Sequence, residues 1–173
     1  MAHSRFDGYK LKADLSVGGI KKLAEEVGNI QRSLPEMCDE FCRALAERGV
    51  AIAKEEISSM GAVETGSLLS SITMKRGDAV NIGSKWIIYT DCYYAEYVEF
   101  GTGSVGARNP HPSGEGMYLQ DLSNKVMTKN GDYGWYFSGG FTTGMPSRPF
   151  MWNTRETLRQ DSIIKEVAKE VFG

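Results

Sequence analysis

The fold of this chain is decided first by residues 94–103, YAEYVEFGTG. Tyr94, Tyr97, Val98 and Gly101 stand at i, i+3, i+4 and i+7, which places them on one face of a single helical pass. A glycine at the end of that pass supplies the left-handed conformation with which helices commonly end. We therefore expect a short helix that ends at Gly101.

A second informative segment, GMPSRPFM, occupies residues 144–151 and places two prolines around Arg148. Because the residue before a proline is pushed toward extended conformations, the main chain at Arg148 has restricted freedom. Its guanidinium has two candidate partners that the sequence does not separate: Glu99 within the fold, toward which we lean, and an acidic group of a neighbouring subunit. Glu96 and Glu99 are three residues apart, so we expect them on the solvent side of the short helix, as a solvated face or an ion pair across a subunit contact.

Composition limits the classes of partner. The 20 basic and 22 acidic residues give a net charge of -2, which provides no electrostatic case for binding nucleic acid or an anionic membrane. No apolar run approaches the roughly 20 residues that cross a bilayer, and no signal-peptide stretch follows the N-terminus. Three cysteines fit a reducing compartment. We expect a single domain over 1–173, made in the cytosol, with proteins as its partners.

The first third of the chain predicts two helices. Apolar residues recur at helical spacing over 17–34, from Ile20 onward. The run Ser33-Leu34-Pro35-Glu36 has the pattern of a capping box with proline in the first turn, so a second, longer helix is expected to start there and to end at Met60-Gly61. Residues 1–16 are expected to form a short strand or an arm.

Beyond the loop at 61–66, the apolar period changes from about 3.6 to 2, which marks the passage from helix to strand. Three short antiparallel strands are expected around 72–74, 80–82 and 86–90, with Asp91 capping the helix that follows. The predicted fold class is α+β: a small antiparallel sheet, a meander of three or more strands, packed against the long helix and a C-terminal helix.

Residues 101–143 are rich in glycine and form a long insertion, in which the aromatic residues at 133–137 predict a strand or hairpin. From Pro149 onward the pattern predicts the C-terminal helix, with Asn153-x-x-Glu156 as a possible internal start signal.

The sequence offers weak signals for chemistry. Cys38 and Cys42 are four residues apart, but a closed zinc site needs four ligands, and few cysteines or histidines remain to complete it. We therefore expect both cysteines to pack in the core. The Thr65-Gly66-Ser67 segment lacks the lysine of a phosphate-binding loop and is expected to cap a short turn at 68–71. No catalytic residue, metal ligand or cofactor is predicted.

Together with ETGSLLSSI at residues 64–72, the segments 94–103 and 144–151 resemble the signature of the tailed-phage neck and tail-component proteins typified by gp10 of phage HK97. The resemblance runs from about Leu34 to the C-terminus. It implies an α+β domain that acts as a non-enzymatic structural part of the neck or tail-completion region of a virion. It also implies assembly into a ring with copies of itself and contacts with adjacent neck or tail proteins.

The family positions map onto residues 97–102 and 145–150. The candidate structural or interface residues are Tyr94, Tyr97, Glu99, Phe100, Gly101, Met145, Arg148, Pro149 and Phe150. Two other functions remain open at this point. One is a small prophage-encoded metal-dependent enzyme with Cys38, Cys42 and His111 as ligands, and the other is a generic protein-binding adaptor.

Overall fold

The computed structural model describes residues 16–62, 66–78, 83–116 and 125–172. The chain divides into two compact units. The first comprises residues 1–48, 74–88 and 158–173, and the second comprises residues 49–73 and 89–157. The helix α1, Val17–Ser59, contributes to both units. The single domain expected over 1–173 stays a prediction.

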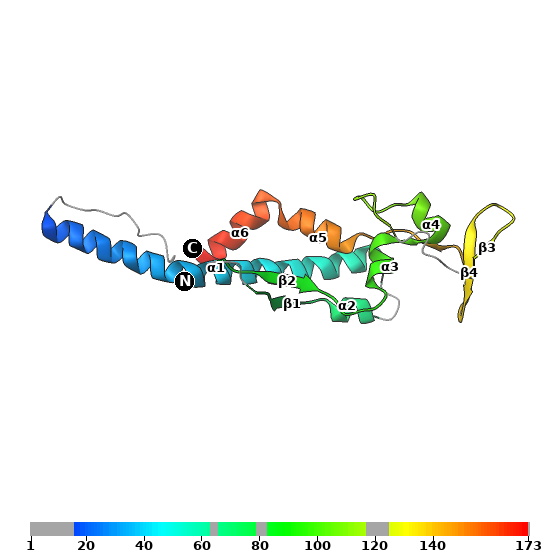
Figure 1. The fold of residues 1–173 in the computed structure, drawn as a ribbon, viewed down its shortest axis with the longest axis horizontal. Helices are drawn as coiled ribbons and strands as arrows, with labels where there is room; N and C mark the ends of the chain where they lie inside the picture. Colours follow the sequence, from blue (N-terminus) through cyan, green and yellow to red (C-terminus); the bar gives the residue numbers. More distant parts are fainter. Residues whose placement is uncertain (1–15, 63–65, 79–82, 117–124, 173) are drawn as a thin grey trace. The chain divides into compact units, whose positions relative to one another are not determined.

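The first unit combines the earlier part of α1 with two strands, β1 (Thr73–Arg76) and β2 (Trp86–Tyr89), which pair as a two-stranded sheet (Figure 1). Asp39 of α1 is the point at which the helix holds this sheet. Its carboxylate accepts hydrogen bonds from the Ser84 hydroxyl and from the Trp86 indole, the latter at 3.1 Å, and forms an ion pair with Arg76 at 3.2 Å. A charged acceptor shared by three donors fixes the sheet on one side of the helix.

The helix α6, Asp161–Phe172, runs antiparallel to α1 within the same unit. The Phe172 ring lies 5.5 Å from the Phe41 ring, and Glu166 lies 3.6 Å from Arg48. As the residue number rises along α6, that of its partner falls along α1. The stripe of α1 around Phe41 is therefore covered by a helix of the same chain.

The prediction of two helices with a boundary at residues 33–36 is wrong, because α1 is continuous across these residues. Pro35 lies inside a continuous helix, and the Ser33 hydroxyl donates to the Ile30 carbonyl at 3.1 Å instead of capping a new helix. Pro35 has no amide for the Gln31 carbonyl, but both residues are exposed, so water can satisfy that carbonyl. The apolar stripe continues in phase on both sides of Pro35, and the shared stripe outweighs the local break signal.

The first and third predicted strands match β1 and β2, although β1 begins at Thr73. The middle predicted strand, at 80–82, lies outside the described residues. Just beyond the paired strands, the Gly77 amide donates to the Lys85 carbonyl at 2.9 Å, which closes the connection between them.

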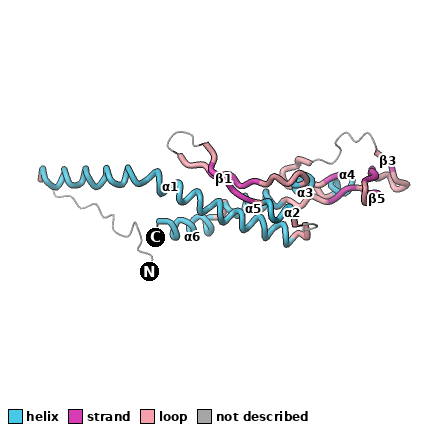
Figure 2. Tube along the Cα trace, turned by 90° about the horizontal axis from the view of Figure 1, so that it is seen from below, coloured by secondary structure: helices cyan, strands magenta, loops and turns pink. Residues whose placement is uncertain are grey.

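The second unit combines the later part of α1 with the helices α2 (Ser67–Ser71), α3 (Ala95–Phe100), α4 (Gly103–Arg108) and α5 (Phe150–Leu158). The three-stranded antiparallel sheet consists of β3 (Val126–Met127), β4 (Tyr133–Phe137) and β5 (Gly140–Thr142). The short strand β6, Gly144–Met145, follows (Figure 2 shows helices and strands in separate colours). The largest fully buried apolar side chains of this unit are Ile57, Leu68, Ile72 and Phe150.

The insertion contains the predicted hairpin, since β4 and β5 pair through Tyr136 and Phe141. The helix α4 was not predicted, because its glycine-rich sequence lacks apolar periodicity. The C-terminal run forms two helices, α5 and α6, instead of one, and the start signal at Asn153 is wrong. Asn153 lies inside α5, where its side-chain amide donates to Glu56 at 2.9 Å. The α+β class is confirmed.

Candidate functional site

The two signature segments, 94–103 and 144–151, lie against each other in the second unit. Thr102 pairs with Met145, and Gly103 pairs with Gly144, in isolated antiparallel bridges. The Arg148 amide donates to the Val98 carbonyl at 2.8 Å. Segments more than forty residues apart in sequence therefore form one main-chain contact region, which we call the joint.

Glycines allow the main chains to approach this closely. Gly144 has a φ of 101°, and a Cβ built on it would lie 1.9 Å from the Thr102 carbonyl oxygen. Gly101 has a φ of 74°, and its Cβ would lie 2.6 Å from the Ser147 nitrogen. Both positions require the left-handed backbone and the absence of a side chain. The expected role of Gly101 as a helix end is confirmed, and the joint adds a packing reason for it.

Glu99 is the central side chain of the joint. It is 7% exposed, and its carboxylate accepts hydrogen bonds from the Met151 and Trp152 amides, both at 2.9 Å. These amides belong to the first turn of α5, where backbone donors lack partners within the helix and the helix dipole favours a negative charge. Glu99 therefore caps α5 from α3. The Ser147 hydroxyl also donates to the main-chain carbonyl of Glu99 at 2.6 Å.

The burial of Glu99 shows that its expected place on the solvent side of α3 is wrong, whereas Glu96 is exposed as expected. Spacing within a six-residue helix indicates which residues share a face, but not that another helix begins against that face. The signal that would have indicated the burial of Glu99 lies fifty residues later in the sequence. Pro149 directly precedes a helix start, and the free amides of such a start need an acceptor.

His111 is buried beside Glu99. Its Nε2 lies 3.1 Å from the Glu99 carboxylate, and its Nδ1 accepts from the Ser113 amide at 3.1 Å and lies 2.6 Å from the Ser113 hydroxyl. Because Nδ1 accepts a main-chain N–H, we assign the ring proton to Nε2, which donates it to Glu99. The imidazole ring also contacts Phe100 and Trp152, with centroids 4.7 Å and 5.3 Å away.

The third signature segment is connected to the joint through Tyr94. The Leu68 amide, in the first turn of α2, donates to the Tyr94 hydroxyl at 3.0 Å. The N-cap of α2 is Gly66, which has no side chain to do this. The expected capping of this turn by residues 65–67 is confirmed for Gly66, the N-cap residue of α2, whose carbonyl accepts from the Ser70 amide at 2.9 Å, while Thr65 lies outside the described residues. By contrast, α3 begins after Tyr94 without a side-chain cap, so the expected cap by Asp91 is wrong.

Arg148 does not pair with Glu99. Within the part of the chain that the structure describes, its guanidinium makes no hydrogen bond or ion pair, and the side chain is half-buried. The intramolecular alternative is therefore wrong, and the acidic group of a neighbouring subunit stays a prediction.

The remaining candidate residues divide by burial. Phe150 is a core side chain, Phe100, Met145 and Pro149 are half-buried, and Tyr97 is exposed. A role of these residues in an interface stays a prediction.

The residues proposed as metal ligands do not form a metal-binding cluster among the described residues. His111 is held by Glu99 and Ser113, while Cys38 and Cys42 are half-buried free thiols on α1. Burial, followed by the nearby Cys38 and Asp39, raises the pKa of the Cys42 thiol, which disfavours the thiolate that binds metals. Among the described residues, no group of three or more histidine, cysteine or acidic side chains is placed to hold a metal ion.

The comparison with protein families agrees with the signature. The model of the HK97-gp10-like family, described as "Bacteriophage HK97-gp10, putative tail-component", matches residues 21–101, just under half of the chain. The resemblance is confirmed over this range, which starts earlier than Leu34 and ends at Gly101, before the segment 144–151. The match supports a role as a phage tail component. No curated protein and no solved structure gives a significant match. None of the described helices has the length and apolar character needed to cross a membrane.

Proposed function

We propose that this protein is a non-enzymatic structural component of a tailed phage or prophage virion. In this proposal it belongs to the neck or tail-completion region. There it connects the head-side connector to the tail by assembling with copies of itself and with neighbouring tail proteins. The family match over residues 21–101 is the observation that carries the proposal.

The geometry of the joint supports a structural use of the signature residues. Gly101 and Gly144 provide close main-chain contact, Tyr94 caps α2, and Glu99 caps α5. Each of these residues stabilises the fold by satisfying a backbone group or by leaving room for one. Residues with these roles make the subunit rigid, and a particle built from repeated copies requires a rigid subunit.

One arrangement within the joint has the residue types of a hydrolase triad: Glu99, His111 and Ser113. In a working triad, histidine accepts the proton of the serine and the carboxylate orients the histidine. Here both Glu99 oxygens already accept main-chain amides, and the Ser113 amide shares Nδ1 with its hydroxyl, as expected for a local turn. The arrangement therefore serves α5 and the loop at 111–115. Ester hydrolysis by the purified protein that Ser113→Ala abolishes would contradict the non-enzymatic proposal.

The proposal is tested in the phage or lysogen that carries this gene. Deletion is expected to yield filled heads and separate tails, seen by electron microscopy, with infectivity restored by the wild-type gene on a plasmid. Mass spectrometry of purified virions is expected to detect the chain. Infectious, joined particles from the deletion strain would reject the proposed position. A chain that is present in infected cells but absent from particles is the result expected of a generic adaptor.

A further inference from the structure

The first half of α1 carries an apolar stripe with the spacing of a coiled coil. Ile20, Leu23, Val27, Ile30 and Leu34 alternate three and four residues apart, which corresponds to the a and d positions of successive heptads. The side chains of Ile20, Val27 and Leu34 are 53%, 46% and 47% exposed. A stripe of this kind is specific for another helix, because knobs from one helix fill holes formed by four residues of the other.

The helix α6 does not extend along α1 as far as this stripe. The two helices run antiparallel, and Phe172, the last described residue, lies beside Phe41. In Figure 1 and Figure 2, α6 lies beside a later part of α1, and no other described element of the first unit accompanies its first turns. The stripe before Met37 thus continues a surface that a helix covers further along, and no described element of the first unit covers it.

The intrinsic stability of this segment is low. Gly18, Gly19 and Gly28 each disfavour the helix by about 1 kcal/mol relative to alanine, and Pro35 in its interior by about 3 kcal/mol. An isolated helix of this length is marginal in water even with favourable residues, and most helical stability in proteins comes from packing of the apolar face. Packing of its apolar face against another helix would therefore stabilise the segment 17–37.

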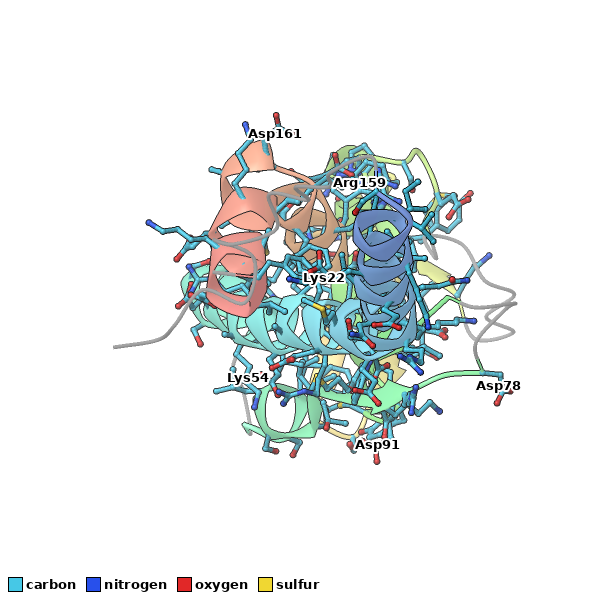
Figure 3. The ribbon with its side chains drawn as sticks, turned by 90° about the vertical axis from the view of Figure 1, so that its left-hand side faces the viewer. Lys22, Lys54, Asp78, Asp91, Arg159 and Asp161 are labelled. Carbon is cyan, nitrogen blue, oxygen red and sulfur yellow. The ribbon has the colours of Figure 1, made fainter. Side chains whose placement is uncertain are left out.

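Charge indicates what that partner is. Along the segment, Lys21 and Lys22 come first, Glu25 and Glu26 follow, and Arg32 and Glu36 stand near its end. Figure 3, viewed toward the first turns of α1, shows Lys22 projecting from the helix. Two copies of the segment side by side in the same direction bring like charges together over their whole length. In the opposite direction, Lys21 can lie level with Glu36 of the other copy and Glu25 with its Arg32, and the two helix dipoles also oppose.

We infer that α1 residues 17–37 form an antiparallel coiled coil with the same segment of a second copy of this chain. In this register Val27 packs against Ile30 of the second copy, and Leu34 packs against Leu23 of the second copy. Lys21 is then level with Glu36 of the second copy. The inference deepens the self-assembly in the proposed function by naming a surface for it, and it rests on that part of the proposal alone.

The first experiment measures the mass of the full-length protein over a range of concentrations by sedimentation. The wild type is expected to dimerise. Val27→Glu places a charge in the seam and is expected to raise the dimer dissociation constant at least about tenfold. Asn29→Glu adds the same charge at an exposed position outside the stripe and is expected to leave dimerisation within about twofold of the wild type. Circular dichroism of both variants confirms that the rest of the chain is folded.

The second experiment tests the register by disulfide formation in a chain whose three native cysteines are replaced by alanine. A mixture of Leu23→Cys and Leu34→Cys chains is expected to form a disulfide between the two variants. Leu23→Cys alone is expected not to form one, because its two copies are offset by about 16 Å along the axis, and a disulfide needs Cα atoms within about 7 Å.

Three results would overturn the inference. They are a wild type that is monomeric at every concentration, a Leu23→Cys chain that cross-links only to itself, and a dimer that forms only after residues 1–15 are removed. The last result would make the chain's own N-terminal residues the cover of the stripe. Each of these outcomes leaves the proposed virion role standing, since a deletion strain that makes no joined particles tests that role separately.

Discussion

The joint and the first half of α1 use their sequences in opposite ways. At the joint, the buried carboxylate of Glu99 and the ring of His111 have partners within the chain, and the glycines leave no space for a side chain. In the first half of α1, the apolar side chains of Ile20, Val27 and Leu34 are about half exposed. The most distinctive motif of the sequence thus marks an internal contact, while an ordinary helical pattern marks the surface that we infer to bind a second copy. A signature is therefore not by itself evidence of an interface.

The largest expected effect comes from Gly144→Ala, which breaks the joint. The new Cβ would lie 1.9 Å from the Thr102 carbonyl oxygen in a residue with a φ of 101°. We expect the free energy of unfolding to fall by about 3–5 kcal/mol, because overlap with main chain adds to backbone strain. Urea denaturation followed by tryptophan fluorescence measures it.

Gly131→Ala is the matched control for that change. Gly131 also has a positive φ, 82°, but its Cβ would meet nothing within 4 Å. We expect a loss of about 1 kcal/mol from backbone strain alone. Equal losses for the two variants would show that close main-chain contact is not what holds the joint.

The next largest effect is expected for Glu99→Gln. The amide keeps one acceptor oxygen but turns an NH₂ group toward donors of α5 or of His111. We expect a loss of about 2–3 kcal/mol in the free energy of unfolding, because a buried donor is left unsatisfied and the charge at the helix start is removed. Glu96→Gln, on the exposed face of the same helix, is expected to change stability by less than about 0.5 kcal/mol.

Sequence reasoning succeeded where a pattern repeats and failed where a contact joins distant segments. The helix at Ala95–Phe100, its end at Gly101 and the hairpin around Tyr133–Phe137 follow from local periodicity and turn residues. The partner of Glu99 does not, because the amides it caps are fifty residues away. Pro35 shows the reverse error. Its local sequence predicted a helix boundary, but the helix continues because the apolar stripe continues on both sides.

Tyr94→Phe sharpens the comparison by removing a single oxygen from the joint. The hydroxyl accepts from the Leu68 amide in the first turn of α2, which has no side-chain cap. We expect a loss of about 1 kcal/mol, the usual cost of losing a helix cap or one hydrogen bond. Hydrogen exchange at the Leu68 amide is expected to accelerate.

Tyr93→Phe is the control for Tyr94→Phe, because Tyr93 is 88% exposed beside it and removal of its hydroxyl is expected to leave stability unchanged. If hydrogen exchange at Leu68 were as slow in Tyr94→Phe as in the wild type, Tyr94 would not be the cap.

The smallest expected effect concerns pH and the first unit, whose sheet is held to α1 through Asp39. The hydrogen bond from Ser84 is the largest cause that lowers the pKa of the Asp39 carboxyl from its ordinary 3.8, with Trp86 and Arg76 adding to it. A carboxyl whose pKa is lower in the folded state stabilises that state above its unfolded pKa, and this contribution is lost as pH falls through the folded value. We therefore expect the first unit to lose stability below about pH 4.

In Ser84→Ala, an NMR titration is expected to show the Asp39 pKa moving back toward its ordinary value. Ser58→Ala, which alters a hydroxyl bonded within α1, is expected to leave the Asp39 pKa unchanged. An unchanged Asp39 titration in Ser84→Ala would mean that Trp86 and Arg76, not the serine, keep the carboxylate charged.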